Sequence, residues 1–132
     1  MPDTQSKVQE TIRIAGSTDT GILRSHNQDY IGFDQKAGIA VLADGMGGHQ
    51  AGEIASRMAV EILMEKLELL ANQQSVRPIT ASHLLDSVSN TISYSNTEIY
   101  EAAEAHPDRK GMGTTVVTAL FTGPHLYIGH AG

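Results

Sequence analysis

An apolar run that ends on a carboxylate and then on glycines has the clearest chemical potential in this sequence. Positions 41–49 read VLADGMGGH. The small and β-branched residues before Asp44 predict a strand buried on both faces, and the glycines after it let the backbone approach a ligand closely. A carboxylate at the end of such a strand is costly to desolvate unless a metal ion, an arginine or backbone donors hold it. In an ordinary strand-to-helix turn, Asp44 would instead cap the helix that follows.

The spacing of the glycines helps to distinguish between two kinds of ligand for this turn, a nucleotide phosphate and a metal ion. A dinucleotide fingerprint, G-x-G-x-x-G, would need glycine where Gln50 stands, and the G-K-[ST] of a phosphate loop is absent. Asp44 would repel a pyrophosphate, but it would attract a hard divalent cation, which takes carboxylate, carbonyl and water oxygens as ligands. The turn therefore favours a metal ion over a nucleotide phosphate.

A second polar run, RSHNQD at 24–29, comes directly before a segment with strand character. The segments 30–33 and 38–43 predict two strands joined by a short hairpin turn. If these strands pair antiparallel, Asp29 at the start of one lies near Asp44 at the end of the other. Two carboxylates and an arginine would then share one edge of the sheet. Taken alone, the same polar run would be interpreted as a solvated loop.

The elements that must position these residues follow from hydrophobic periodicity, which is close to two in strands and 3.6 in helices. They are a first strand from Thr11 that includes Ile12 and Ile14, a helix over 51–72, a second helix capped by Thr80 or Ser82 that ends near His106, and two strands over 114–121 and 126–129. The order of strands, two long helices and strands predicts an α+β fold.

Composition limits the class of protein. The 132 residues have room for one small domain, expected over 11–132 after a flexible polar lead at 1–10. The net charge of −6 argues against nucleic acid or an anionic membrane as the main partner. The chain has no cysteine, which excludes disulfides and thiolate metal sites and is compatible with a reducing cytosol. With no apolar run of membrane-spanning length and no signal-peptide core, we expect a cytoplasmic protein.

Six short motifs follow one another along the chain. They are TG at 20–21, RSHNQD at 24–29, VLADGMGGH at 41–49, GEIAS at 52–56, GMGTT at 111–115 and YIGHAG at 127–132. In this order and spacing they resemble the N-terminal half of a bacterial-type protein phosphatase 2C, a family of metal-dependent Ser/Thr phosphatases. The resemblance implies a four-layer α-β-β-α sandwich, of which this chain would form the first half.

The resemblance also implies a role for each candidate site residue. Asp44 matches the aspartate that bridges two Mn²⁺ or Mg²⁺ ions, and Gly45 matches the glycine whose carbonyl binds one of them. Arg24 matches the arginine that holds the substrate phosphate, and Asp29 matches an acid that orients metal-bound water. The implied reaction is hydrolysis of phosphoserine or phosphothreonine in a protein substrate by a hydroxide that bridges the metals.

Two positions depart from the family pattern. Gln28 stands where some members have glutamate, which would remove one charge from the water network around the metals. Met46 stands where eukaryotic members have a histidine proposed as general acid, and we do not transfer that role to His49.

The remaining metal-binding aspartates of the family are expected beyond Gly132. Hard cations need several anionic ligands to offset their dehydration, so we expect the chain alone to be inactive and to leave open sheet edges. The alternative is a non-catalytic module that binds phosphoproteins or regulates a partner. The sequence leaves the oligomeric state open.

Overall fold

The computed structural model describes residues 12–132. The expected lead at 1–10 lies outside this range. The elements in chain order are the strands β1 (Asp29–Asp34) and β2 (Ile39–Met46), the helices α2 (Ala51–Val76) and α3 (Ala81–Ala105), the short 3₁₀ helix η1 (Pro107–Arg109), and the strands β3 (Gly113–Thr114), β4 (Val116–Thr122) and β5 (His125–Ala131).

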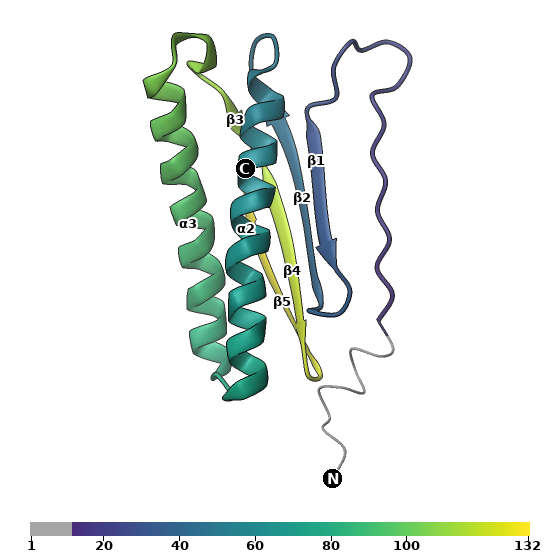
Figure 1. Ribbon diagram of the computed structural model, residues 1–132, viewed down its shortest axis with the longest axis vertical. Helices are drawn as coiled ribbons and strands as arrows, with labels where there is room; N and C mark the ends of the chain where they lie inside the picture. The colour runs from purple at the N-terminus through teal and green to yellow at the C-terminus, as the bar shows by residue number, and fades with distance from the viewer. Residues whose placement is uncertain (1–11) are drawn as a thin grey trace.

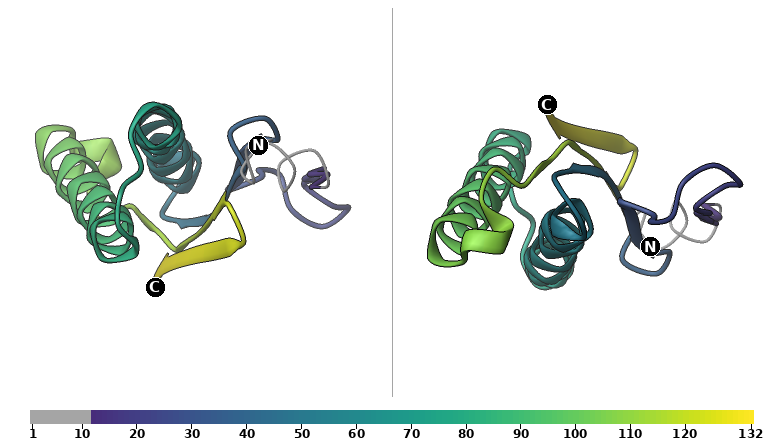
Figure 2. Two further views of the ribbon diagram at one scale, coloured as in Figure 1. Left: turned by 90° about the horizontal axis from the view of Figure 1, so that it is seen from below. Right: turned by 90° about the horizontal axis from the view of Figure 1, so that it is seen from above.

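The strands form one antiparallel sheet in the order β1-β2-β4-β5, and β3 pairs with the end of β2. Figure 1 shows α2 and α3 side by side along the strands, and both views of Figure 2 place the two helices on the same face of the sheet. α2 lies over β1 and β2, and α3 lies nearer to β5. The α+β class is confirmed, and the described residues form one sheet layer and one helix layer.

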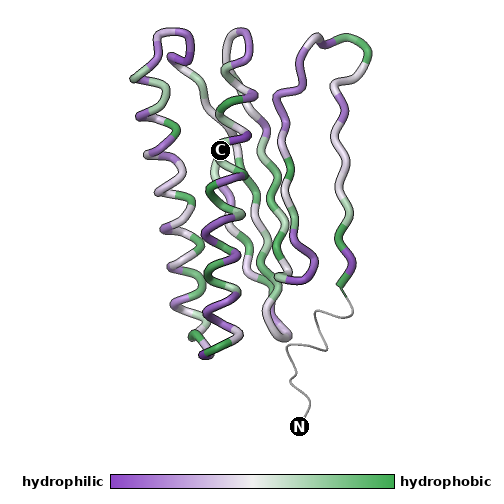
Figure 3. Tube along the Cα trace, viewed as in Figure 1, coloured by the Kyte–Doolittle hydropathy of each residue, from purple (hydrophilic) through white to green (hydrophobic). Residues whose placement is uncertain are grey.

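The core lies between the sheet and the helices, because one face of each strand and one stripe of each helix are apolar. Figure 3 shows hydrophobic residues along the central strands, whereas the start of β1 is hydrophilic. The largest fully buried apolar side chains come from β2, both helices and β4, and they are Ile39, Leu63, Leu67, Leu84 and Leu120.

The prediction that β2 is buried on both faces is wrong. Val41 and Ala43 are buried under the helices, but Leu42 between them is 51% exposed. Val117 and Ile128 on the neighbouring strands are also exposed. Within the described residues, both helices cover the same face of the sheet (Figure 2), so the side chains of the opposite face stay in solvent.

The first expected strand, which includes Ile12 and Ile14, does not form within the described residues. The Ile14 N–H donates to the side-chain Oε1 of Gln35 at 3.1 Å instead of joining a ladder of backbone hydrogen bonds. Gly16 lies against the side chains of Ile31 and Phe33. The segment therefore follows β1 without extending the sheet.

Both predicted helices form. The first begins at Ala51 as expected but continues to Val76, four residues beyond the predicted end. Thr80 caps the second, since its side chain accepts a hydrogen bond from the His83 N–H at 3.3 Å. The predicted strand over 114–121 is broken at Thr115 into β3 and β4.

Candidate metal and phosphate site

The hairpin of β1 and β2 brings the two predicted carboxylates together. Asp29, the first residue of β1, is the register partner of Asp44 near the end of β2. Directly opposed residues in an antiparallel pair have side chains on the same face of the sheet, within contact distance. The expectation that these strands pair and place Asp29 near Asp44 is confirmed.

The electrostatics of this pair favour a bound cation. Loss of hydration is the largest cause that raises the pKa of Asp29, and the hydrogen bond and negative charge of Asp44 raise it further. The charge of Arg24 acts in the opposite direction and lowers the pKa of Asp29. The fold therefore holds two carboxylates closer than their charges favour, and a positive charge at this place relieves the repulsion.

Arg24 lies in the loop that leads into β1, and its side chain is exposed. Its electrostatic effect on Asp29 places it in the same neighbourhood as the carboxylate pair. An exposed guanidinium beside two carboxylates is free to contact an anion that approaches from solvent. The structure thus brings Arg24, Asp29 and Asp44 to one end of the sheet.

The turn after Asp44 is built on close backbone contacts. A Cβ on Gly45 would overlap the carbonyl oxygen of Gly52, which belongs to the first turn of α2. Gly47 has a φ of 149°, and a Cβ there would lie 3.0 Å from the Cβ of Ala51. Only glycine fits at these two positions, so β2 passes directly against the start of α2.

Asp44 does not cap α2, which was the alternative interpretation of this turn. The residue before the helix is Gln50, and no side chain there makes a capping hydrogen bond. The carbonyl of Asp44 accepts a hydrogen bond from the Thr115 N–H at 2.9 Å. This bond joins the end of β2 to Thr115, between β3 and β4, and no local sequence pattern indicates it.

His26 and Glu53 form a further contact that sequence reasoning missed. The His26 Nδ1 lies 3.2 Å from the Glu53 Oε1, which joins the loop of Arg24 to the first turn of α2. Both residues fall within recognised motifs, RSHNQD and GEIAS. Their partnership depends on how the loop folds back on the helix, so neither motif alone could predict it.

The carboxylate pair fits part of a divalent metal site. Two facing carboxylates and a nearby backbone carbonyl are oxygen ligands of the kind that Mg²⁺ and Mn²⁺ take. Among residues 12–132, however, no three His, Asp or Glu side chains are grouped closely enough to hold a metal ion together. The two carboxylates alone are therefore too few to form a complete site for such an ion.

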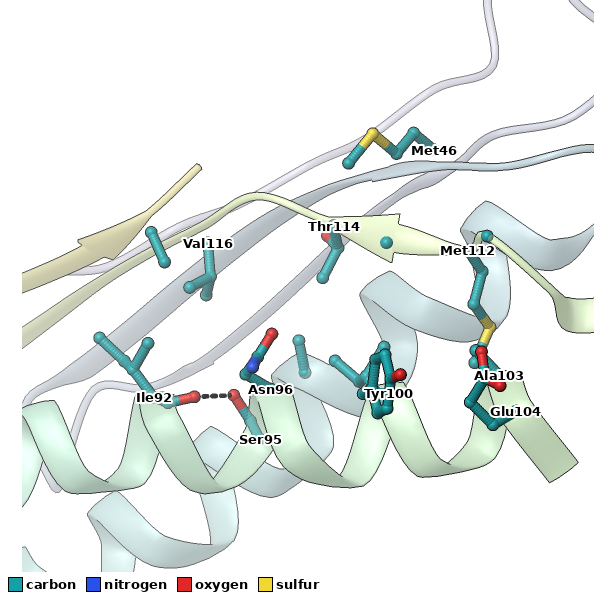
Figure 4. Close-up of a pocket in the computed structure, with 15 residues that line it drawn as sticks. Met46, Ile92, Ser95, Asn96, Tyr100, Ala103, Glu104, Met112, Thr114 and Val116 are labelled. Carbon is teal, nitrogen blue, oxygen red and sulfur yellow. Dashed lines mark hydrogen bonds between the residues drawn. The ribbon is translucent and has the colours of Figure 1, made fainter.

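A cavity of about 280 Å³ lies between α3 and β3. Figure 4 shows Asn96 and Tyr100 of α3 facing Thr114 across it, with Met46 beyond the strand. Its lining is mostly apolar, and neither Asp29 nor Asp44 contributes to it. The cavity is therefore separate from the carboxylate pair.

An antiparallel sheet covered by a helix pair, with opposed carboxylates where β1 begins and β2 ends, defines an α+β domain with a candidate cation site. The family model of protein phosphatase 2C matches residues 23–132. The chain belongs to the protein phosphatase 2C family.

Individual proteins similar to this chain in sequence are also phosphatases. The serine/threonine phosphatase stp of Listeria innocua is 38% identical over 118 residues, which are 87% of this chain and 45% of that protein. The serine/threonine protein phosphatase PstP of Mycobacterium tuberculosis is 35% identical over 129 residues, which are 96% of this chain and 23% of that protein. The chain thus spans less than half of the length of these relatives.

Solved structures show the same fold. The catalytic domain of PstP, solved in complex with two manganese ions, matches with a TM-score of 0.71 and 33% identity over 86% of this chain and 45% of that one. The phosphatase Stp1 of Staphylococcus aureus matches with a TM-score of 0.73 and 34% identity over 88% of this chain and 44% of that one.

In the described part of the chain, no helix is long and apolar enough to cross a membrane.

Proposed function

We propose that this chain contributes to a metal-dependent phosphatase that hydrolyses phosphoserine and phosphothreonine in proteins. The observation that carries the proposal is the register pairing of Asp29 with Asp44 beside the charge of Arg24. This arrangement offers oxygen ligands for a cation and a guanidinium for a phosphate within one small region. The family membership points to the same reaction class.

Each residue has a distinct task in the proposal. Asp44 and the carbonyl of Gly45 would hold divalent cations, Mn²⁺ or Mg²⁺, together with other oxygen ligands. Asp29 would orient the attacking water from its place opposite Asp44, and loss of hydration and the charge of Asp44 raise the pKa of its carboxyl. Arg24 binds the phosphate oxygens through its planar fork of N–H donors.

The cations, when bound, supply a water of lowered pKa and neutralise the charge that develops on the phosphoryl group. The residues of this chain position the reactants. The backbone contact between Gly45 and the first turn of α2 keeps the end of β2 in place, and the bond from Thr115 to the Asp44 carbonyl supports it from the other side.

The substrate in this proposal is a phosphorylated Ser/Thr protein in the cytoplasm. The lack of cysteine is compatible with that location, and the net charge of −6 disfavours nucleic acid as a partner. The alternative function is a module that binds phosphoproteins without hydrolysing them. The observation on its side is that no three His, Asp or Glu side chains are grouped to hold a metal ion among residues 12–132.

Substitution of Asp44 in the full-length protein separates these functions. Asp44→Ala should abolish Mn²⁺-dependent hydrolysis of a phosphoserine peptide, because it removes a carboxylate that no other described side chain replaces. Asp86→Ala, on the exposed face of α3, is a matched control that should retain the wild-type rate. Phosphate release is measured across a Mn²⁺ titration, and circular dichroism checks the fold.

Wild-type rates in Asp44→Ala at saturating Mn²⁺ would refute the metal-ligand role. A wild-type protein that binds the phosphopeptide but releases no phosphate with Mn²⁺ or Mg²⁺ would establish the binding module instead.

A further inference from the structure

Gln28 is placed between the carboxylate pair and the glycine turn. Its backbone carbonyl accepts a hydrogen bond from the Gly45 N–H at 2.9 Å. Its side-chain Nε2 donates to the carbonyl oxygen of Gly47 at 3.0 Å. Gln28 therefore forms hydrogen bonds with the residues before and after Met46, in the turn that follows Asp44.

The Gln28 side chain also fills a space that only a glycine leaves open. A Cβ on Gly52, in the first turn of α2, would lie 2.7 Å from both the amide carbon and the amide nitrogen of Gln28. The amide is thus packed between the turn and the helix, and Gln28 is partly buried. Because the Gln28 amide fills the space beside Gly52, its side chain has little freedom to turn away from Gly47.

The chemistry of the contact requires a donor. The carbonyl of Gly47 can only accept a hydrogen bond, and a glutamine amide supplies two N–H donors. An ionised glutamate has the same shape but only accepts, so its oxygen would face the Gly47 oxygen without a proton between them. Glutamine at position 28 therefore differs from glutamate in two ways. It carries no charge, and it supplies the N–H that the Gly47 carbonyl accepts.

The Gly45 carbonyl is oriented by the same contacts. In a strand, the N–H and C=O of one residue face the same neighbouring strand. Since the Gly45 N–H donates to Gln28, the Gly45 carbonyl faces the chain that leads into Asp29. A movement of Gln28 should therefore also shift the Gly45 carbonyl oxygen, which is a metal ligand in the proposed function.

We propose that Gln28 is a positioning residue that fixes the turn over 45–47 and thereby sets the geometry of Asp44 and the Gly45 carbonyl toward a divalent cation. This inference rests on the proposed function for its catalytic consequence. Its structural part, that the Gln28 amide holds the turn, stands on the contacts to Gly47 and Gly52.

The test uses two variants of the full-length protein that differ in charge. Gln28→Glu loses the donor and adds a charge, while Gln28→Met has similar size and loses the donor alone. Gln35→Glu is the control, because Gln35 uses its Oε1 to accept from Ile14 and a glutamate keeps that bond. The control also adds one negative charge, at the opposite end of β1.

The first readout needs no metal. Amide hydrogen exchange of Gly45 in the cation-free protein should be faster in both Gln28 variants and unchanged in Gln35→Glu. The second readout is Mn²⁺ affinity by calorimetry, which should weaken on the order of tenfold in both Gln28 variants, as is typical when a residue that orients a metal ligand is lost. The kcat should fall with it, while the KM for a phosphopeptide stays near the wild-type value.

Unchanged Gly45 exchange and wild-type Mn²⁺ affinity in Gln28→Met would overturn the inference. Tighter Mn²⁺ binding and normal kcat in Gln28→Glu would also overturn it, because the residue would then act through charge. Failure of the proposed function looks different, since the wild-type protein itself would then bind no Mn²⁺ and release no phosphate.

Discussion

The opposed carboxylates make the candidate site sensitive to both pH and cations. Because the pKa of Asp29 is raised in the folded protein, the fold favours the protonated form of this carboxyl. The contribution of Asp29 to stability is fully present below its unfolded pKa. This stabilisation is lost as the pH rises through the higher pKa that Asp29 has in the folded protein. Above that pKa, the folded state holds two negative carboxylates, Asp29 and Asp44, next to each other.

Asp29→Asn should therefore stabilise the full-length protein in the absence of divalent cations. Its melting temperature should exceed that of the wild type at about pH 7, and the difference should shrink as the pH falls toward about 4, near the ordinary pKa of aspartate. Asp86→Asn serves as the control. Added Mn²⁺ should raise the melting temperature of the wild type more than that of Asp29→Asn. A difference that does not change with pH would contradict the coupling of Asp29 to Asp44.

Arg24 should affect substrate binding and leave metal binding alone. Arg24→Ala should raise the KM for a phosphopeptide on the order of tenfold or more, since hydrogen bonds to charged groups contribute about 1.5 to 3 kcal/mol. Arg57→Ala, which removes an exposed arginine paired with Glu61 on α2, should leave the KM unchanged. Calorimetric Mn²⁺ affinity should be the same in all three proteins. Loss of Mn²⁺ binding in Arg24→Ala would show that the arginine supports the site and does not bind phosphate.

The sequence predicts the position of a residue well where that position depends on the residues next to it in the chain. The apolar run before Asp44 and the short turn between the strands were enough to place Asp29 opposite it. The contacts of Gln28 with Gly47 and of His26 with Glu53 could not be predicted, because they form only when the loop folds against α2. Such contacts depend on tertiary geometry that no local pattern encodes.

At the scale of elements, the helix starts were predicted better than the other boundaries. The start of α2 at Ala51 and the Thr80 cap of α3 carry local signals in residue type. The end of α2 at Val76 has a weaker signal: its last turn contains no basic residue, but Pro78 disfavours the helical conformation of Arg77, which is extended. The gap at Thr115 between β3 and β4 also lacks a local signal, and the Thr115 N–H still donates to the Asp44 carbonyl, which lies 71 positions away in the sequence.

The two candidate caps of α3 can be distinguished by substitution. Thr80→Ala should lower the free energy of unfolding by about 1 kcal/mol, because the His83 N–H loses its acceptor. Ser82→Ala, already inside the helix, should change it by less than about 0.5 kcal/mol. Thr80→Ser should retain the cap. Chemical denaturation of the full-length protein measures these values, and an equal effect of the Thr80 and Ser82 changes to alanine would contradict the assignment.

At the scale of the whole molecule, the helices leave one face of the sheet without a cover among the described residues. Leu42 and its register partner Val117 are 51% and 49% exposed on this face, and Ile128 is 58% exposed. The sequence pattern of β2 was interpreted as two-sided burial because its residues are apolar on both faces. That composition suits a strand between two layers, as in the four-layer sandwich that the family resemblance implies.

The exposed face should make the 132-residue chain self-associate when it is expressed alone. Burial of apolar surface is worth about 25 cal/mol per Å², and an open sheet edge adds unpaired backbone groups. The double variant Leu42→Thr and Val117→Thr places a β-branched residue at both positions while it makes this face less apolar, so it should shift the chain toward the monomer mass of 14.1 kDa. Leu69→Gln is the matched control, because Leu69 is 56% exposed but lies on α2. Sedimentation velocity over a range of concentrations measures the change, and a wild-type chain that stays monomeric throughout would show that this face needs no partner.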